Sequence, residues 1–197
     1  MPQKLKKAIK RESILQTALT LFSVKGFHKT TIPDIARRLG MSSGNLYNYF
    51  GSKDELAKEI IKYTSDYLGE KIREVNEQDI TSQEKIRKIV ELYFAMTLEK
   101  PEMIEYFLRV YLSHREVFLN GCEGMLCVSG FMTEIMIFFS EGVQKGELRD
   151  QDFFAAFGLF MGYLGGMAFL HGEAILERPL DEYVHDVATN IYTALKA

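Results

Sequence analysis

The chain has 197 residues, of which 47% are hydrophobic, and its 24 Lys and Arg against 27 Asp and Glu give a net charge of −3. This apolar content allows a sizeable buried core and excludes an intrinsically disordered chain. No basic stretch followed by a long apolar run opens the sequence, so we expect no signal peptide and a cytoplasmic protein. The two cysteines, Cys122 and Cys127, are too few for a disulfide framework and are expected to be free thiols.

The charge is unevenly distributed along the chain. Residues 1–60 hold 11 Lys and Arg and 5 Asp and Glu, a balance of +6, whereas the remainder holds 13 and 22, a balance of −9. A basic head joined to an acidic body is typical of a nucleic-acid-binding segment on a part that does not bind nucleic acid. A basic end also fits a merely solvated surface, so the motifs in that segment have to decide between the two.

Four helices are expected in the first third of the chain: near 9–25, from Thr31 to Gly40, from Ser42 to near Phe50, and from Ser52 to about Asn76. Apolar residues recur at helical spacing in the first of them, and Gly26 is expected to end it. Thr31 with Asp34, and Ser52 with Glu55, match the capping-box pattern of a helix start.

Longer amphipathic segments follow, and we expect helices near 82–99, 102–119, 123–145, 151–176 and 181–195. Pro101 and Pro179 mark breaks between them, and Gly146 marks a turn. Because Val and Thr nowhere alternate as in strands, the sequence predicts an all-α fold of about nine helices. We place a helix-turn-helix DNA-binding domain at 1–52 and a ligand-binding and dimerisation domain at 53–197, with the fourth helix linking head to body.

The segment from Thr31 to Phe50 has the pattern of a helix-turn-helix. Ala36 is small where the two helices would cross, Gly40 suits the turn, and Leu46 points inward. Ile35, Leu39, Met41 and Tyr49 supply further inward positions. Short polar groups and an aromatic then face outward, suited to base edges and phosphates: Ser43, Gly44, Asn45, Tyr47 and Asn48. Around them lie candidate phosphate contacts: Thr31, Arg37, Arg38 and Lys53. An ordinary helix pair is the alternative that this spacing alone leaves open.

A family resemblance rests on Ile14–Leu15–x–x–Ala18–Leu19–x–Leu21–Phe22, Gly26–Phe27, Thr30–Thr31–Ile32, Ile35–Ala36 and Leu46–Tyr47–x–Tyr49–Phe50–x–Ser52–Lys53–x–x–Leu56. Over about residues 9–60 the chain resembles the N-terminal signature of TetR-type (TetR/AcrR) transcriptional regulators. Beyond residue 60 the likeness is architectural, with a similar Gly142–Val143–x–x–Gly146–Glu147–Leu148 turn.

The resemblance implies a homodimeric, repressor-like regulator with a small-molecule cavity in its C-terminal domain. It also implies that seven residues lie near double-stranded operator DNA: Thr31, Ser43, Asn45, Tyr47, Asn48, Tyr49 and Lys53. Pro33 stands where many members carry a polar or basic residue aimed at DNA, so the operator sequence cannot be inferred by analogy.

Residues 153–172 contain no Lys, Arg, Asp or Glu and carry Gly158, Gly162 and Gly166 at a spacing of four. Length and composition alone fit a transmembrane helix. The acidic flanks and the lack of a basic cluster favour a soluble helix buried on one side in its own chain and on the other against a second copy. With the last helix, which contributes Tyr183, Val187 and Ile191, this helix is expected to form the four-helix interface of an obligate homodimer.

The body is rich in aromatic residues and Met, which either fill its core or line an adaptable apolar cavity. We expect an apolar or amphipathic small-molecule effector in a pocket lined by Tyr93, Met96, Phe107, Tyr111, Met132, Phe139 and Met161, with His171 as a polar anchor. The effector is expected to release the protein from DNA.

Other classes of protein find little support in the sequence. His171–Gly172–Glu173 matches half of a zinc-deaminase pattern, but no Pro-Cys-x-x-Cys follows, and we expect no metal site and no cofactor. Nucleophile and phosphate-loop motifs are missing, so we expect no enzyme. A helical adaptor for protein partners has no need for the outward polar face between Ser42 and Phe50.

Overall fold

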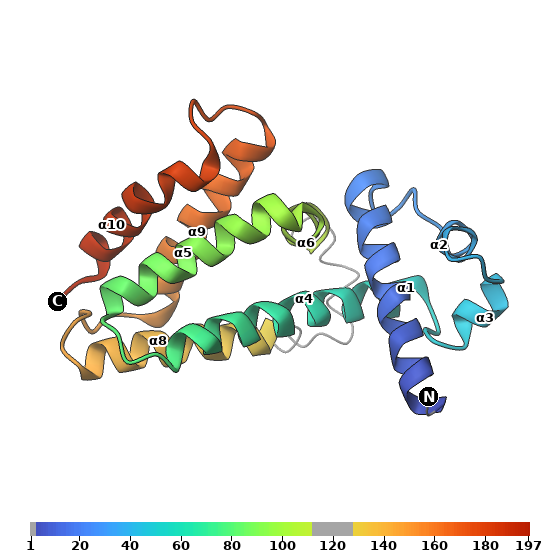
Figure 1. Ribbon diagram of the computed structural model, residues 1–197, viewed down its shortest axis with the longest axis horizontal. Coiled ribbons are helices and arrows are strands. Elements are labelled where there is room, and N and C mark those ends of the chain that lie inside the picture. The colour runs from blue at the N-terminus through green and yellow to red at the C-terminus, as the bar shows by residue number, and fades with distance from the viewer. Residues whose placement is uncertain (1–2, 112–127) are drawn as a thin grey trace. The chain divides into compact units, whose positions relative to one another are not determined.

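The computed structural model describes residues 3–111 and 128–197 and, of residues 109–111, the backbone alone. Within these ranges the regular secondary structure is helical and there is no strand, only one isolated antiparallel bridge between Leu148 and Lys196, which confirms the predicted all-α class (Figure 1). The elements are α1 (Gln3–Lys25), α2 (Ile32–Arg38), α3 (Ser43–Tyr47), α4 (Lys53–Asn76), α5 (Ser82–Glu99), α6 (Pro101–Glu105), the π-helix η1 (Tyr106–Tyr111), α8 (Ser129–Gln144), α9 (Phe153–Gly172), the 3-10 helix η3 (Leu180–Tyr183) and α10 (Val184–Leu195).

The helices form two compact units. Unit 1 comprises the described residues of 1–64 and 102–128, and unit 2 comprises 65–101 and 129–197. Helix α4 runs through both, because its first half belongs to unit 1 and its second half to unit 2. The functional division that we predict between residues 52 and 53 is a different kind of boundary and stays a prediction.

Unit 1 has an aromatic core. Phe22 lies beside Phe27 and Tyr106, with ring centroids 5.3 and 6.1 Å away. The Tyr106 hydroxyl donates a 2.9 Å hydrogen bond to the carbonyl of Ala57, so η1 is tied to the first half of α4. Burial raises the pKa of the Tyr106 hydroxyl above its usual value.

Unit 2 is built around α5, which packs against α9, α10 and η3. The apolar face of α10 is buried in the unit, with Val187, Ile191 and Leu195 at most 1% exposed. Two glycines mark the closest approach of α4 and α8, because a Cβ on Gly69 would lie 2.8 Å from the backbone of Gly130. These contacts fix the second half of α4 to the rest of the unit.

Several helix bounds differ from those expected. Helix α1 begins at Gln3 and not near residue 9, although residues 3–9 are exposed and bury no apolar face. The helix expected over 102–119 is instead α6 followed by η1, as far as it is described. That expected over 123–145 is described from Ser129, as α8. Cys122 and Cys127 lie outside the described residues.

Candidate nucleic-acid interface

The start of α2 is fixed by a reciprocal cap, as the sequence predicts. The Asp34 backbone N–H donates to the Thr31 hydroxyl at 3.3 Å, while the Asp34 carboxylate accepts the Thr31 backbone N–H at 3.1 Å. The hydrogen bonds from the Thr31 hydroxyl and backbone lower the pKa of Asp34. Pro33 lies in the first turn, where a helix needs no backbone donor.

The turn between α2 and α3 contains Gly40, whose φ of +62° lies in the left-handed region that favours glycine. The N–H of Met41 donates to the carbonyl of Ala36 at 3.0 Å and closes the C-terminus of α2. One residue later, the Ser42 hydroxyl accepts the Asn45 N–H at 3.2 Å and caps α3. Ala36 and Leu46 are buried, so α2 and α3 are held together at the predicted positions.

This packing leaves a polar face of α3 open to solvent. Gly44, Asn45, Tyr47 and Asn48 are exposed, and Ser43 is half-buried. Tyr47 is 51% exposed, which is unusual for a large aromatic side chain. A Cβ on Gly44 would meet nothing within 4 Å, so no side chain covers the backbone of α3 at this point.

The predicted phosphate-binding residues fall into an exposed group at α2 and Lys53, which is half-buried. Thr31, Arg37 and Arg38 are exposed on or beside α2, and Arg37 lies 3.4 Å from the carboxylate of Asp34. Tyr49 follows α3 and is half-buried. These exposed residues and the outward face of α3 both belong to the α2–α3 pair of unit 1, and their contact with DNA stays a prediction.

The side chain of Lys53 binds groups within unit 1. Its Nζ donates to the carbonyls of Phe27 and Thr30, at 3.0 and 3.3 Å, and lies 4.2 Å from the centroid of the Phe27 ring. The buried Thr30 hydroxyl in turn donates to the carbonyl of Gly26 at 2.9 Å. Lys53 therefore connects the start of α4 to the loop between α1 and α2, a role that its sequence position does not signal.

Arg11 is a second positioning residue that sequence reasoning missed. Its guanidinium lies 2.7 Å from the carboxylate of Glu59 on α4 and 4.7 Å from the centroid of the Phe50 ring. Phe50 is buried and lies three residues beyond the end of α3. Arg11 thus joins α1, the end of the helix-turn-helix and α4.

The residues predicted to line a ligand pocket are dispersed. Tyr93 and Met96 on α5, and Met132 and Phe139 on α8, are buried in unit 2, and burial raises the pKa of Tyr93. Met161 and His171 on α9 are half-buried. Phe107 belongs to unit 1 and so does not lie in the same unit as the others, and the side chain of Tyr111 lies outside the described residues.

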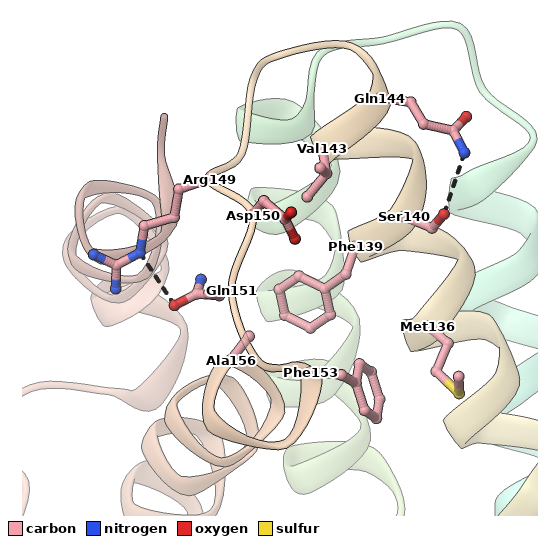
Figure 2. A pocket seen from close by; sticks show the side chains of 10 residues that line it. All are labelled: Met136, Phe139, Ser140, Val143, Gln144, Arg149, Asp150, Gln151, Phe153 and Ala156. Atoms are coloured by element: carbon pink, nitrogen blue, oxygen red, sulfur yellow. Dashed lines mark hydrogen bonds between the residues drawn. The ribbon is translucent and has the colours of Figure 1, made fainter.

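A pocket of about 300 Å³ opens elsewhere in unit 2, between α8, the following turn and the start of α9 (Figure 2). The apolar part of its lining consists of Met136, Phe139, Val143, Phe153 and Ala156. The polar part consists of Ser140, Gln144, Arg149, Asp150 and Gln151. The Nε of Arg149 donates to Gln151 at 3.1 Å. Of the predicted residues only Phe139 is among the lining, because the sequence offers no signal beyond a polar turn at 147–150.

The glycine side of α9 is open in the single chain. Gly158, Gly162 and Gly166 are exposed, and a Cβ on any of them would meet nothing within 4 Å. Phe154 and Phe169 on the same helix are 60% and 57% exposed. By length and composition α9 is apolar enough to cross a membrane, but a core helix of a soluble protein passes the same test. In this structure 28% of the apolar 18-residue window of α9 is buried.

The other predicted dimer residues lie differently. Tyr183 is half-buried beneath the guanidinium of Arg178, 4.2 Å from its ring centroid. Val187 and Ile191 are 1% and 0% exposed in the single chain, so their side chains are taken up by its own core. The face of α10 that is open to a second chain is the polar one, with His185, Thr189 and Asn190.

Two helices joined by a glycine turn, the second capped and presenting an exposed polar face, define a helix-turn-helix protein. Residues 14–60 match the family described as bacterial regulatory proteins, tetR family. Over these residues the chain carries the N-terminal domain of the TetR family, which confirms the resemblance noted over residues 9–60.

Curated relatives share part of this sequence, and solved structures share its fold. The chain is 32% identical over 88 residues to the transcriptional repressor KstR2 of Mycolicibacterium smegmatis, which covers 45% of this chain and 42% of KstR2. It is 38% identical over 58 residues to the biofilm operon regulator IcaR of Staphylococcus aureus, covering 29% and 31%. The matches thus span less than half of either relative. The structure of FadR from Bacillus subtilis in complex with stearoyl-CoA superposes with a TM-score of 0.80 at 19% identity, covering 92% of this chain and 97% of FadR, and shows the shared fold.

Proposed function

We propose that this protein is a DNA-binding transcriptional repressor that a small apolar or amphipathic ligand releases from its operator. The observation that carries the proposal is the exposed face of α3, where Asn45, Tyr47 and Asn48 are open to solvent on a helix capped by Ser42. Amide groups of this kind pair with adenine in the major groove, and hydroxyls bind phosphates or bases. The family's regulators and the named repressors among the relatives support the same function.

The active form is a homodimer in the cytoplasm. A short helix such as α3 covers one half-site, and two heads about 34–36 Å apart meet successive major grooves of a palindromic operator. The open glycine side of α9, flanked by Phe154 and Phe169, offers the apolar surface that a second copy covers. Burying this surface between two chains, and not in a membrane, accounts for the apolar composition of α9.

The effector binds in unit 2 as an amphipathic molecule. The pocket between α8 and α9 combines Met136, Phe139 and Phe153 with a polar part that contains Arg149 (Figure 2). This lining suits an apolar chain or ring with a polar or anionic group toward the guanidinium. FadR, whose fold this chain shares, was crystallised with stearoyl-CoA, an amphipathic molecule of the same broad class.

Release follows from a shift between two conformations of the dimer. A ligand that prefers the conformation with the wrong head spacing weakens DNA binding, and DNA weakens ligand binding by the same factor. We assign helix α4 the role of transmitting this change, because one continuous helix contributes to both units. No step of this mechanism needs catalysis, and we assign no enzymatic activity.

The DNA-binding proposal is tested by selecting bound fragments from a random duplex library with the purified protein at two salt concentrations. We expect one palindromic motif whose affinity falls steeply as salt rises. Binding without a motif would contradict a specific regulator. To remove a co-purified ligand, the selection is repeated after unfolding and refolding, and no binding in both rounds would contradict the proposal.

The ligand proposal is tested by screening lipophilic compounds, with and without an anionic group, against the protein bound to the selected operator. We expect an active compound to release the DNA and raise the melting temperature of the free protein. Met136→Trp, which narrows the pocket, should weaken that effect, whereas Leu98→Trp on the exposed side of α5 should not. An effect that is equal in both variants would contradict this pocket.

A further inference from the structure

The first turns of α1 form an exposed basic segment. Residues 3–11 contain five cations, and no acidic residue occurs before Glu12. The segment is helical from Gln3, and its four lysines are exposed at Lys4, Lys6 and Lys7 and half-buried at Lys10. No apolar packing against the rest of unit 1 explains why the helix continues this far, because residues 3–9 are all exposed.

Within residues 3–111 and 128–197 the structure gives these four lysines no acidic partner. Among the residues that the structure describes, none of them forms an ion pair, in contrast to Arg11, which is paired with Glu59 at 2.7 Å. Lys6 and Lys10 are four residues apart, and Lys4 and Lys7 three, so the like charges are neighbours on the helix surface and repel one another. A polyanion lying against the segment would remove this repulsion.

Arg11 ends the basic segment and holds this end in unit 1. Its guanidinium lies 4.7 Å from the ring of Phe50, and Phe50 follows α3 by three residues. The basic turns therefore end next to Phe50, in the connection that follows α3, and in Figure 1 the N-terminal part of α1 extends beyond this point within unit 1.

The helical spacing divides the lysines into two faces. Lys4, Lys7, Arg11, Ile14 and Ala18 follow one another at alternating intervals of three and four, so they lie along one side of α1. Ile14 and Ala18 are fully buried against unit 1. Lys4 and Lys7 therefore lie on the same side of α1 as Arg11, whereas Lys6 lies on another side.

We propose that residues 3–10 form a second DNA-binding surface, in which Lys4 and Lys7 bind backbone phosphates flanking the base pairs that α3 contacts. The inference rests on the proposed operator binding and adds its partner group and its extent. Lysine supplies a mobile point charge without base specificity, so this surface contributes affinity and salt dependence and no sequence selectivity. A DNA backbone is favoured over an anionic lipid surface because Arg11, which ends the segment, contacts Phe50 in the connection that follows the proposed recognition helix α3.

The test compares the full-length wild type with Lys4→Ala/Lys7→Ala in titrations of the selected operator by fluorescence anisotropy over a range of salt concentrations. Each phosphate contact adds about 0.9 to the steepness of log Kobs against log salt, so a dimer that loses four contacts should show a slope shallower by about 3 to 4. The ratio of operator to scrambled-duplex affinity should stay within about threefold, because only phosphate contacts are lost.

Two controls make the result specific. Lys88→Ala/Lys145→Ala removes the same charge from unit 2 and should change the slope by less than one contact, about 0.9. An operator trimmed of its flanking base pairs should bind the wild type and Lys4→Ala/Lys7→Ala equally. Melting temperatures confirm that every variant is folded.

The inference is overturned if Lys4→Ala/Lys7→Ala keeps the wild-type slope, or if its change matches that of Lys88→Ala/Lys145→Ala. It is also overturned if the variant loses sequence discrimination, or if it binds the operator as the wild type does but no longer binds vesicles of anionic phosphatidylglycerol. Failure of the wild type to select any operator would instead contradict the proposed function itself.

Discussion

Lys53 shows how one side chain can have a structural role inside a DNA-binding domain. Its ammonium group is shared between two carbonyls and an aromatic ring, all in or next to the loop that joins α1 to α2. This arrangement positions the start of α2, and through α2 the recognition helix. Any contribution of Lys53 to DNA affinity is therefore expected to be coupled to the stability of unit 1.

Replacing Lys53 by Met should lower the free energy of unfolding by about 1–3 kcal/mol, because two carbonyls lose a charged donor and the ring loses its cation. Lys53→Arg should recover part of the loss. Urea unfolding followed by circular dichroism measures both. An unchanged unfolding midpoint together with a shallower salt slope for DNA binding would assign Lys53 to phosphate contact alone.

Asp34 makes the stability of unit 1 depend on pH. Its pKa is lowered in the folded state by hydrogen bonds from Thr31, so the unfolded chain takes up this proton more readily than the folded one. The stabilisation is therefore present above the unfolded pKa of about 3.9 and is lost as pH falls through the folded value. Asp34→Asn should show a smaller drop in melting temperature between pH 6 and pH 3 than the wild type. An equal drop would show that the capping box does not contribute.

At the scale of the elements, the second half of α4 is tied to α8 and α5 by polar contacts inside unit 2. Lys85 on α5 is 3% exposed, and its Nζ donates to the carbonyl of Asn76 at 2.6 Å and to Glu141 on α8 at 3.0 Å. Glu134, also on α8, accepts from Arg73 and Asn76 on α4 at 2.9 and 3.2 Å. These bonds hold the end of the helix that both units share.

The crossing of α4 and α8 leaves no room for a side chain at Gly69. Gly69→Ala would place a methyl group 2.8 Å from backbone atoms of Gly130, and backbone cannot yield as the tip of a side chain can. The expected cost is about 1–3 kcal/mol, measured by urea unfolding. Gly44→Ala, on the exposed α3, is the matched control because its methyl group meets nothing within 4 Å. Equal stability of the two variants would contradict the close crossing.

The elements of the head could be predicted because their signals are local. Thr31, Gly40 and Ser42 fix caps and a turn within a few residues, and each acts as its residue type predicts. The early start of α1 had no such signal, since helix propensity without an apolar face leaves no period to detect. The pocket was missed because it depends on how α8 and α9 pack, which no single segment encodes.

The apolar face of α10 illustrates a second limit. Val187 and Ile191 have the spacing of a packed face, but a period cannot tell whether the face meets its own chain or a partner. In the structure α5 covers it. The glycines of α9 differ from this face, because a Cβ on Gly158, Gly162 or Gly166 would meet nothing within 4 Å in the single chain.

At the scale of the whole molecule, the proposed dimer makes DNA binding depend on α9. Gly162→Leu adds a large side chain where the single chain has free space, so each chain should fold as before while close approach of two copies is blocked. Sedimentation equilibrium should show a monomer, and operator affinity should fall by more than about tenfold because one head alone remains. A variant that stays dimeric would place the interface elsewhere.

Above all, we propose that the exposed face of α3 makes this protein a sequence-specific DNA-binding regulator. The most direct test measures, by fluorescence anisotropy, the affinity of the wild type and of Asn45→Ala/Tyr47→Ala for the selected operator and for a scrambled duplex of equal length. We predict that the variant keeps the wild-type melting temperature, loses operator affinity by more than about tenfold and binds the scrambled duplex within about threefold of the wild type. A wild type that binds both duplexes equally, or a variant that discriminates as well as the wild type, would contradict the claim.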